Sequence, residues 1–234
     1  KRAIDVVYSE EELSKPRESP WGTTNREQKE GLELSVGQHL ELKEYAHSLD
    51  MDYIVSCWDN DSLSDVAVLD VDYHKVASAM VCDLDFLHAL NSTNKPVILS
   101  VGMCTQEQID KAISQIANLG HILCCTSTYP TAVDELNLRH INHMKDKYPQ
   151  YKIGFSNHYN GHDACISAVA MGAECVEFHI THDRTAYGSD QAASIQNSED
   201  LVKGIRNVEK MLGDGVKKIY DSEIPIMEKL RRVK

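Results

Sequence analysis

The sequence ECVEFHITHDRTAYGSDQAAS, residues 174–194, begins as a short apolar strand and ends in a turn that is dense with polar groups. Side chains alternate between the two faces of a strand, so Glu177 and His179 would share one face while the opposite face is wholly apolar. A strand with one polar and one apolar face is typical of a strand whose end faces a binding or catalytic site. The segment 155–158, one strand earlier, also ends in a polar side chain, His158. We therefore predict that His158 and His179 hold a divalent metal between neighbouring strand ends.

The composition limits the classes of partner. The chain has 234 residues, with 36 acidic against 24 basic residues and a formal net charge of -12. This balance argues against nucleic acid and anionic membranes, although a small anionic substrate could still meet local cations. No apolar run approaches the roughly 20 residues that span a bilayer. We predict one domain over residues 1–234, in which residues 214–234 form a C-terminal extension.

Seven cysteines are scattered along the chain, several of them inside apolar runs, and no two form a CxxC pair. Reduced, buried thiols of this kind are typical of cytoplasmic proteins, and the lack of a CxxC pair disfavours a zinc–thiolate site. The opening residues 1–5 do not have the character of a signal peptide. We therefore expect a cytoplasmic protein.

Strand-like and helix-like segments alternate along the chain. The expected strands cover residues 53–55, 73–79, 96–99, 121–125, 152–155 and 174–180. The helices expected to follow them cover residues 61–69, 83–92, 105–119, 134–147, 163–171 and 198–212. Six strand-then-helix units predict a parallel sheet that is covered by helices.

Local signals refine three of the segments. Thr105 would cap the helix 105–119, and Gly120 would close it. Residues 1–9 look like the exit of a strand. Residues 10–26 are polar and interrupted by proline and glycine, so we expect a long loop there, which is either a lid over a site or a disordered surface loop.

A polar side chain lies near the C-terminal end of every expected strand. These side chains are Ser56, Ser78, Ser100, Ser127, Ser156 and His179. A barrel builds its site from all of its strand ends, whereas an open doubly wound sheet uses one switch point. No Gly-x-Gly-x-x-Gly follows a strand, which disfavours a dinucleotide fold. We predict an α/β fold of the (β/α)8 TIM-barrel type, with six strands and a possible stub at residues 1–9.

Lys75 lies in the middle of an expected strand, where lysine is disfavoured unless it is solvated or paired. It either extends out of the sheet into solvent or supplies the cation for a phosphate or carboxylate. In the second case the serines at neighbouring strand ends would add hydroxyl donors. Arg184 has a similar pair of interpretations, because it could bind its neighbour Asp183 or meet an anionic ligand.

The two histidines also have an alternative interpretation, since a histidine at a strand end is often a hydrogen-bonded structural residue. His162 and His182 are rival ligands that rank lower, because one lies beyond its turn and the other falls on the face opposite His179. Imidazole groups with Glu177, Asp190 and water nearby suit manganese, iron or zinc.

Six motifs carry a resemblance that covers essentially the whole chain. They are KVAS (75–78), PVILSVGM (96–103), CTSTYP (125–130), SNH (156–158), EFHIT (177–181) and GSDQAAS (188–194). In their order and spacing these motifs resemble the sialic acid synthase family, the phosphoenolpyruvate-condensing synthases of nine-carbon sugar acids.

The resemblance implies a site that takes phosphoenolpyruvate, an amino sugar or other aldose, and a divalent metal, usually manganese or magnesium. His158 and His179 would ligate the metal. The residues implied to contact phosphoenolpyruvate are Ser56, Lys75, Ser78, Ser100 and Ser156. The residues implied on the sugar side are Ser127, Tyr129, Glu177 and Asp190. Of these, Glu177 and Asp190 could manage protons, and Lys75 would also act in catalysis.

The implied reaction joins C3 of phosphoenolpyruvate to the aldehyde carbon of N-acetylmannosamine or a related aldose and releases phosphate. We also expect the protein to form a homo-oligomer, a dimer. Two alternatives remain open. One is another phosphoenolpyruvate–aldose synthase of the superfamily, making an eight- or seven-carbon acid, and the other is a truncated, non-catalytic barrel that keeps phosphate affinity only.

The chain departs from the family pattern in several places. We expect two earlier strands, bearing a Glu and a Lys-Phe-Gln that face the substrate, to be missing, so that the chain is a fragment or needs a partner. The antifreeze-like C-terminal domain of many relatives is also expected to be absent. Asn157 replaces a commoner Asp, Met80 a Glu and Cys124 a His.

Overall fold

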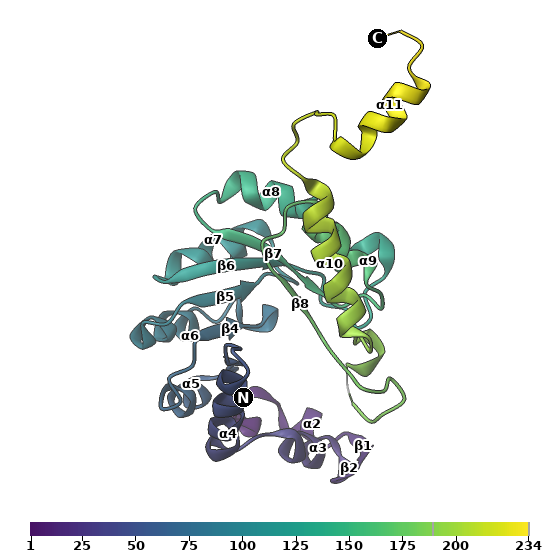
Figure 1. Cartoon of the computed structure of the whole chain (residues 1–234). Helices are drawn as coiled ribbons and strands as arrows, with labels where there is room; N and C mark the ends of the chain where they lie inside the picture. The colour runs from purple at the N-terminus through teal and green to yellow at the C-terminus, as the bar shows by residue number, and fades with distance from the viewer. Residues whose placement is uncertain (189, 234) are drawn as a thin grey trace.

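The computed structural model describes residues 1–188 and 190–233, so Ser189 of the last motif lies outside the described residues. Six strands form a single parallel sheet in chain order, and each strand pairs with the next (Figure 1). The strands are β3 (Ile54–Ser56), β4 (Tyr73–Val76), β5 (Val97–Ser100), β6 (Leu119–Cys124), β7 (Lys152–Asn157) and β8 (Val176–Phe178). The sheet curls like the wall of a barrel, which confirms the predicted fold class and the six strands.

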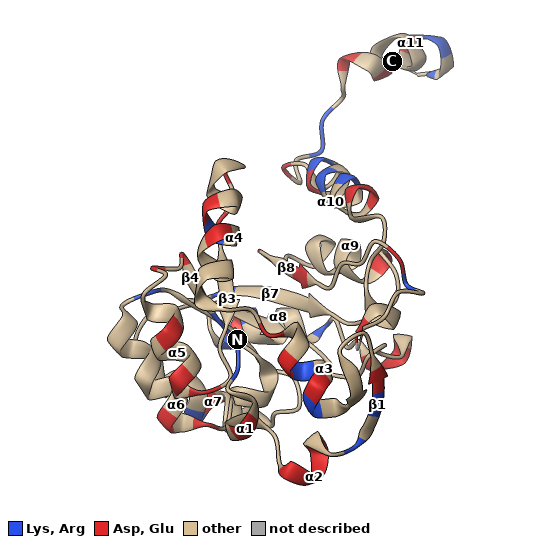
Figure 2. Ribbon diagram, turned by 90° about the horizontal axis from the view of Figure 1, so that it is seen from below, with Lys and Arg blue, Asp and Glu red and all other residues tan. Residues whose placement is uncertain are grey.

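Helices connect successive strands and cover the outer face of the sheet, as right-handed parallel connections require. The connecting helices are α5 (Asn60–Ala67), α6 (Leu84–Ala89), α7 (Gln106–Gln115), α8 (His140–Lys147) and α9 (Asp163–Ala170), and α10 (Ser198–Leu212) follows the last strand. α4 (Val36–Ser48) precedes β3. Asp and Glu residues occur along several of these helices, including α4 and α5 (Figure 2).

Short 3₁₀-helices complete several of the connections. They are η1 (Ser78–Met80), η2 (Leu90–Thr93), η3 (Val133–Glu135), η4 (Gln191–Ala193) and η5 (Asp221–Glu223). Because η1 begins at Ser78, the strand expected to run to residue 79 ends at Val76.

The capping box predicted at the start of α7 is confirmed, since the Thr105 hydroxyl accepts from the main-chain N–H of Gln108. The predicted end of this helix is wrong. Ile116 already has an extended backbone, and Leu119 pairs with Val97 in the sheet. Gly120 therefore belongs to β6, where main-chain hydrogen bonds to the neighbouring strands hold the segment, and it does not close the helix.

Residues 1–32 are more regular than predicted. Lys1 continues the sheet, because its main-chain nitrogen donates to the Ser56 carbonyl (2.6 Å) and its carbonyl accepts from Trp58 (3.1 Å). The rest of the segment 1–9 is not a strand. It contains α1 (Ile4–Val7) and is followed by α2 (Glu10–Leu13), a hairpin of β1 (Pro16–Ser19) and β2 (Gly22–Thr24), and α3 (Asn25–Leu32).

The prediction of a structureless loop over residues 10–26 is therefore wrong, for two physical reasons. Ser9 caps α2, and Thr24 with Glu27 forms a capping box at α3, so both short helices satisfy their first N–H groups locally. In addition, Leu13 is buried, so this segment shields an apolar side chain from water.

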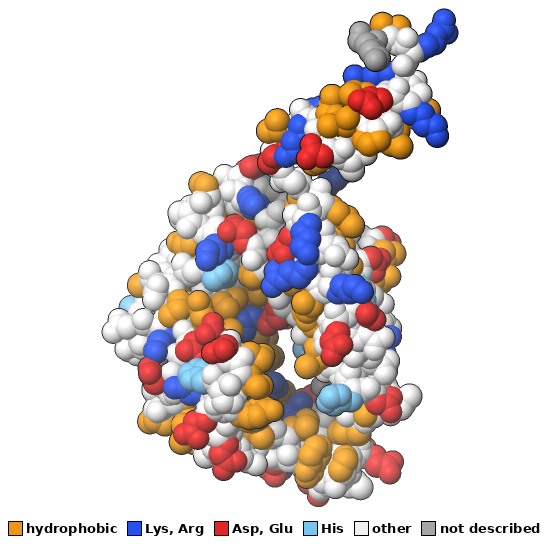
Figure 3. All heavy atoms as spheres, in the orientation of Figure 1, with side chains coloured by type: hydrophobic (Ala, Val, Ile, Leu, Met, Phe, Trp, Pro, Cys, Tyr) orange, Lys and Arg blue, Asp and Glu red, His pale blue; other side chains and the backbone are white. Residues whose placement is uncertain are grey.

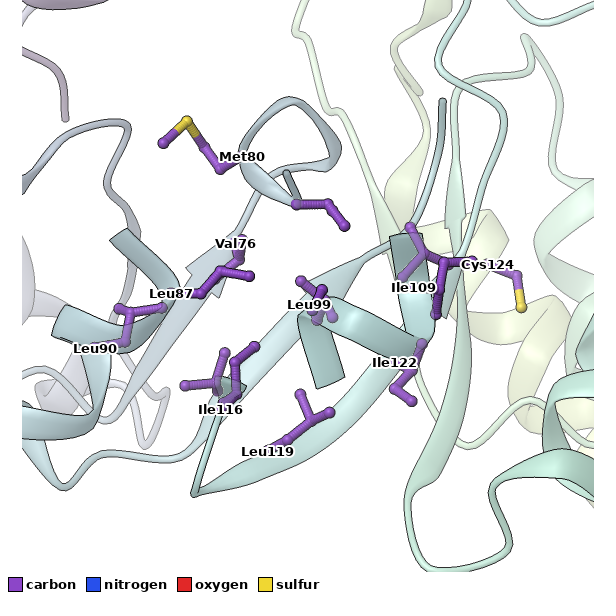
Figure 4. Packing of buried hydrophobic residues seen from close by; sticks show 14 of the residues in the cluster. Val76, Met80, Leu87, Leu90, Leu99, Ile109, Ile116, Leu119, Ile122 and Cys124 are labelled. Atoms are coloured by element: carbon purple, nitrogen blue, oxygen red, sulfur yellow. The ribbon is translucent and has the colours of Figure 1, made fainter. Parts of the chain in front are cut away.

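The main hydrophobic core lies between the sheet and its helices. Alternate residues of adjacent strands, including Val76, Leu99 and Ile122, are fully buried on this outer side and pack with helix residues such as Ile109 (Figure 4). The residues between them point to the inner side, where polar groups gather. Lys75, between His74 and Val76, is one of these inward residues.

The C-terminal residues 213–233 leave the body after α10 and carry α11 (Ile224–Leu230), which stands apart in Figure 1. Several large apolar side chains of this region, such as Leu230, are exposed. In the described part of the chain no helix combines the length and the hydropathy needed to cross a bilayer.

Leu99 tests the core between sheet and helices. Leu99→Ala should lower the free energy of unfolding by about 2–5 kcal/mol, because the side chain is fully buried and its removal leaves a cavity. Urea titration gives this value. Val68→Ala is the matched control, since Val68 is 75% exposed and its truncation should change stability by about 0.5 kcal/mol or less. Equal effects of the two changes would contradict the packing described.

His74 should make the fold sensitive to acid. Burial lowers the pKa of its imidazole, whereas the unfolded side chain titrates near about 6.5. Protonation therefore favours the unfolded chain, and the stability from neutral His74 is complete above that pH and declines as the pH falls below it. Urea titrations at two pH values should show a smaller loss in His74→Leu than in the wild type. The exposed His88→Leu control should keep the wild-type pH dependence.

Candidate active site

One cavity of about 510 Å³ opens at the C-terminal ends of the strands. It gathers the predicted site residues from six strand ends and the loop that follows β8. Those that line it are Ser56, Lys75, Ser78, Ser100, Ser127, Tyr129, Ser156, His158, Glu177, His179 and Asp190. Figure 3 shows the opening, with Lys and Arg side chains visible inside it. The alternation predicted for β8 is thus confirmed for Glu177 and His179.

His158 and His179 face each other inside this cavity, with ring centroids 5.4 Å apart. His158 Nδ1 lies 2.8 Å from the Thr126 carbonyl, which leaves Nε2 free toward the cavity. Burial lowers the pKa of His158, so the neutral, ligating form prevails. His179 Nδ1 lies 3.7 Å from Asp190 Oδ2. Two imidazoles and a carboxylate suit an open metal site that water and substrate would complete.

Within the described residues no three His, Cys, Asp or Glu side chains are already arranged around a common metal position. The rivals His162 and His182 do not line the cavity; His162 lines a separate hollow beside α9. The donor set that faces the cavity is therefore the predicted pair and not its rivals.

Tyr129 packs against both histidines. Its ring centroid lies 4.1 Å from that of His158, and its ring is perpendicular to His179 at 5.6 Å. Burial, reinforced by the charge of Asp190, raises the pKa of Tyr129 to about 12. The phenol therefore keeps its proton near neutral pH and can donate a hydrogen bond into the cavity.

Lys75 points into the cavity and not out to solvent, which rules out the solvated alternative. Its ammonium lies 3.4 Å from Glu177 Oε1, and it donates to the Val76 carbonyl at 3.2 Å. Ser100 Oγ lies 3.4 Å from the other Glu177 oxygen. The lysine side chain is only 11% exposed. A cation held this deep beside hydroxyl groups can attract a phosphate or carboxylate more strongly than a cation in water.

Two of the hydroxyl groups predicted to bind substrate have no partner among the residues that the structure describes. They are Ser56 Oγ and Ser127 Oγ, and both are buried. Ser78 Oγ, by contrast, accepts from the main-chain N–H of Gly102 at 2.9 Å and contacts Cys125 Sγ. An unpaired buried polar group costs about 1–3 kcal/mol, so a ligand that supplies the missing partners would recover that free energy.

Arg184 is the one predicted site residue that does not line this cavity. Its Nε donates to the Ser194 carbonyl at 2.9 Å, and the side chain borders the hollow beside α9. The three departures from the family pattern also lie outside the cavity wall. Asn157 is buried and bonds the main chain of Tyr159, while Met80 and Cys124 belong to the hydrophobic core.

Three cationic or aromatic side chains of the cavity wall were not predicted from the sequence, namely Arg2, Lys29 and Trp58. The Arg2 guanidinium carbon lies 4.4 Å from the Trp58 ring centroid, and the Lys29 ammonium lies 4.3 Å from the Tyr8 ring centroid. Trp58 follows a strand directly and could have been identified by that position. The two cations carry no such signal, because only the folding of residues 1–32 across the sheet brings them to the cavity.

A curled parallel sheet with a polar site at its strand ends defines a TIM-barrel type of α/β protein. The chain belongs to the NeuB family, whose model matches residues 2–217. This confirms the resemblance drawn from the motifs.

Named relatives agree with this family. The chain is 32% identical to the human N-acetylneuraminate-9-phosphate synthase, over 98% of the chain and 66% of that protein. It is 33% identical to the N,N'-diacetyllegionaminic acid synthase of Legionella pneumophila, over 92% of the chain and 63% of that protein. The chain thus spans slightly less than two thirds of the length of these relatives.

Solved structures support the same fold. The N-acetylneuraminic acid synthetase of Leptospira borgpetersenii matches with a TM-score of 0.75 and 31% identity, over 86% of this chain and 73% of that chain. A truncated 3-deoxy-D-arabino-heptulosonate 7-phosphate synthase from Thermotoga maritima matches with a TM-score of 0.62 over 76% of this chain and 72% of that chain. At 22% identity the second likeness concerns the fold alone.

Gly102 offers a test of the serine cluster. A Cβ at this position would lie 2.3 Å from Ser127 Oγ and 3.0 Å from Ser78 Oγ. Gly102→Ala should therefore displace both hydroxyl groups and weaken phosphate binding roughly tenfold or more, as loss of charge-assisted hydrogen bonds does. Calorimetric titration with inorganic phosphate measures the change. Gly120→Ala, whose Cβ would meet only an ordinary contact at 3.8 Å, should bind as the wild type does. Unchanged binding by Gly102→Ala would exclude the Ser78 hydroxyl from the anion site.

Proposed function

We propose that this protein condenses phosphoenolpyruvate with an aldose, such as N-acetylmannosamine, to give a nonulosonic acid and phosphate. The observation that carries the proposal is that Lys75 with its serines and the pair His158–His179 open onto one cavity. In this proposal Lys75 binds the anionic substrate, and the two histidines hold the metal that polarises a carbonyl group in the same cavity. The family supports the same chemistry, since its named members are synthases of such acids.

Phosphoenolpyruvate would bind around Lys75. The ammonium offsets the charge of the phosphate or carboxylate, and hydroxyl groups from four strand ends donate to its oxygens. These are the groups of Ser56, Ser78, Ser100 and Ser156. Because Glu177 already lies against Lys75, the anion would compete with this carboxylate and leave it free to act elsewhere in the cavity.

His158 and His179 would hold a divalent metal, manganese or magnesium. When bound, such an ion polarises the aldehyde oxygen of the sugar. The sugar itself would lie among Ser127, Tyr129 and Asp190. Tyr129 can donate a hydrogen bond to a sugar oxygen because its phenol stays protonated.

The reaction forms a bond between C3 of phosphoenolpyruvate and the aldehyde carbon, while the oxygen of a water molecule adds to C2. The bond between C2 and the phosphate oxygen then breaks, and phosphate leaves with the bonding electrons. The C2 hydroxyl becomes the keto group as its proton passes to the departing phosphate. A base must take a proton from the water and an acid must protonate the new alkoxide. Glu177 and Asp190 are the carboxylates placed to exchange these protons, because each lies on the cavity wall beside a proposed substrate contact.

The acceptor sugar and the assembly are further parts of the proposal. The human relative is named for a 9-phosphate product and the Legionella relative for N,N'-diacetyllegionaminic acid. Membership of the family therefore leaves the phosphorylation of the acceptor open. A homodimer and a cytoplasmic location stay predictions from the sequence.

An assay of phosphate release from phosphoenolpyruvate, with a panel of aldoses and with or without manganese, tests the proposal. His158→Ala and His179→Ala should each abolish metal-dependent turnover and weaken manganese binding, which calorimetry follows independently of activity. The exposed His88→Ala should retain both properties. Turnover that survives either cavity substitution would remove that imidazole from the metal site. A folded, full-length protein that releases no phosphate with any sugar would refute the synthase and favour the non-catalytic barrel.

A further inference from the structure

Two cations line the cavity on the side that the N-terminal segment contributes. Arg2 precedes α1, and Lys29 belongs to α3, so neither residue is part of the sheet. Both are half-buried. Together with Lys75 they give the cavity three positively charged side chains in a chain whose net charge is -12. Lys75 has a role in the proposed reaction, whereas Arg2 and Lys29 do not yet have one.

No carboxylate neutralises either side chain within residues 1–188 and 190–233. Glu33 bonds the main-chain N–H of Arg2 and the Lys1 ammonium, and not the Arg2 guanidinium. Arg26, which precedes Lys29 by one turn of α3, instead pairs with three carboxylates away from the cavity. The N-terminal segment therefore contains several acidic residues, but within the described residues none of them forms an ion pair with the two cations that face the cavity.

Aromatic rings hold these cations in place. The Arg2 guanidinium lies over Trp58 and hydrogen bonds the Tyr8 hydroxyl, while the Lys29 ammonium lies over the Tyr8 ring. Contact with a ring orients a cation without cancelling its charge. The remaining N–H donors of Arg2, and those of Lys29, stay available to a ligand. A guanidinium and an ammonium side by side suit a phosphate ester, which accepts several charge-assisted hydrogen bonds.

We propose that Arg2 and Lys29 form a second anion subsite, which binds the phosphate of a phosphorylated aldose. The inference rests on the proposed function, because it specifies the acceptor of that reaction. Lys75 and its serines already account for the anionic groups of phosphoenolpyruvate. A cavity of about 510 Å³ falls in the range that holds a ligand of drug size, so two small substrates fit it together. The acceptor is thus a hexosamine phosphate, and the product retains its phosphate ester.

Steady-state kinetics with two acceptors test this subsite in the full-length protein. Phosphoenolpyruvate consumption is followed with N-acetylmannosamine and with N-acetylmannosamine 6-phosphate. The phosphorylated sugar should have the higher kcat/KM by about 10- to 100-fold, the effect of one or two charge-assisted hydrogen bonds. Lys29→Met keeps the aliphatic stem and should remove most of this preference by raising the KM for the phosphorylated sugar. Lys29→Arg should retain the preference.

Lys203→Met on the exposed surface of α10 is the matched control and should leave both acceptors unaffected. A wild type that prefers the unphosphorylated sugar would overturn the subsite and leave the synthase proposal standing. The same conclusion follows if Lys29→Met raises the KM for phosphoenolpyruvate instead of that for the sugar phosphate, because the cations would then serve the other substrate.

A binding measurement separates the two proposals if neither sugar is turned over. Calorimetric titration with N-acetylmannosamine 6-phosphate should then show an affinity that Lys29→Met lowers about tenfold and Lys203→Met does not. This result would support the subsite in a protein that is not the proposed synthase. Equal affinity in the two variants would overturn the subsite as well.

Discussion

Parallel pairing from β3 to β8 is the constraint on which the rest of this structure depends. Parallel neighbours need a crossover helix between them, so every strand runs the same way and all six carboxyl ends meet at one edge. The outward residues of each strand pack against the helices. The inward residues and the strand ends do not take part in this packing, and the polar side chains of the cavity lie there. A single topological rule thus separates the part of each strand that stabilises the fold from the part that meets a ligand.

Within the cavity, burial controls which groups carry charge. It lowers the pKa of His158 and raises that of Tyr129, so both rings are neutral near pH 7. Lys75 lies beside Glu177, whereas within the described residues no carboxylate pairs with Arg2 or Lys29 on the same wall. An anionic substrate can therefore meet these two cations directly, and it reaches Lys75 by displacing Glu177. This arrangement favours anionic ligands over neutral ones of the same shape.

The sequence predicted the strands and the polar strand ends well because both signals are local. Alternation identifies the inward face of β8, and a capping pair identifies the start of α7. The N-terminal segment was predicted poorly because its elements are short, and their caps and the burial of Leu13 outweigh the breaking effect of proline and glycine. Arg2 and Lys29 depend on contacts across the fold, which no local pattern carries. Arg184 shows the reverse error, since a plausible motif position does not ensure that a side chain turns toward the site.

The unpaired hydroxyl groups of Ser56 and Ser127 have a consequence for how this protein can change over time. At each position a group that can bind a ligand is retained at a cost in stability, because an apolar side chain there would make the ligand-free protein more stable. Heat tolerance and substrate capture are therefore opposed at these two positions. A homologue that evolves at higher temperature and keeps its ligand binding must therefore gain stability at other positions. The packing between the helices and the outer face of the sheet is one such place.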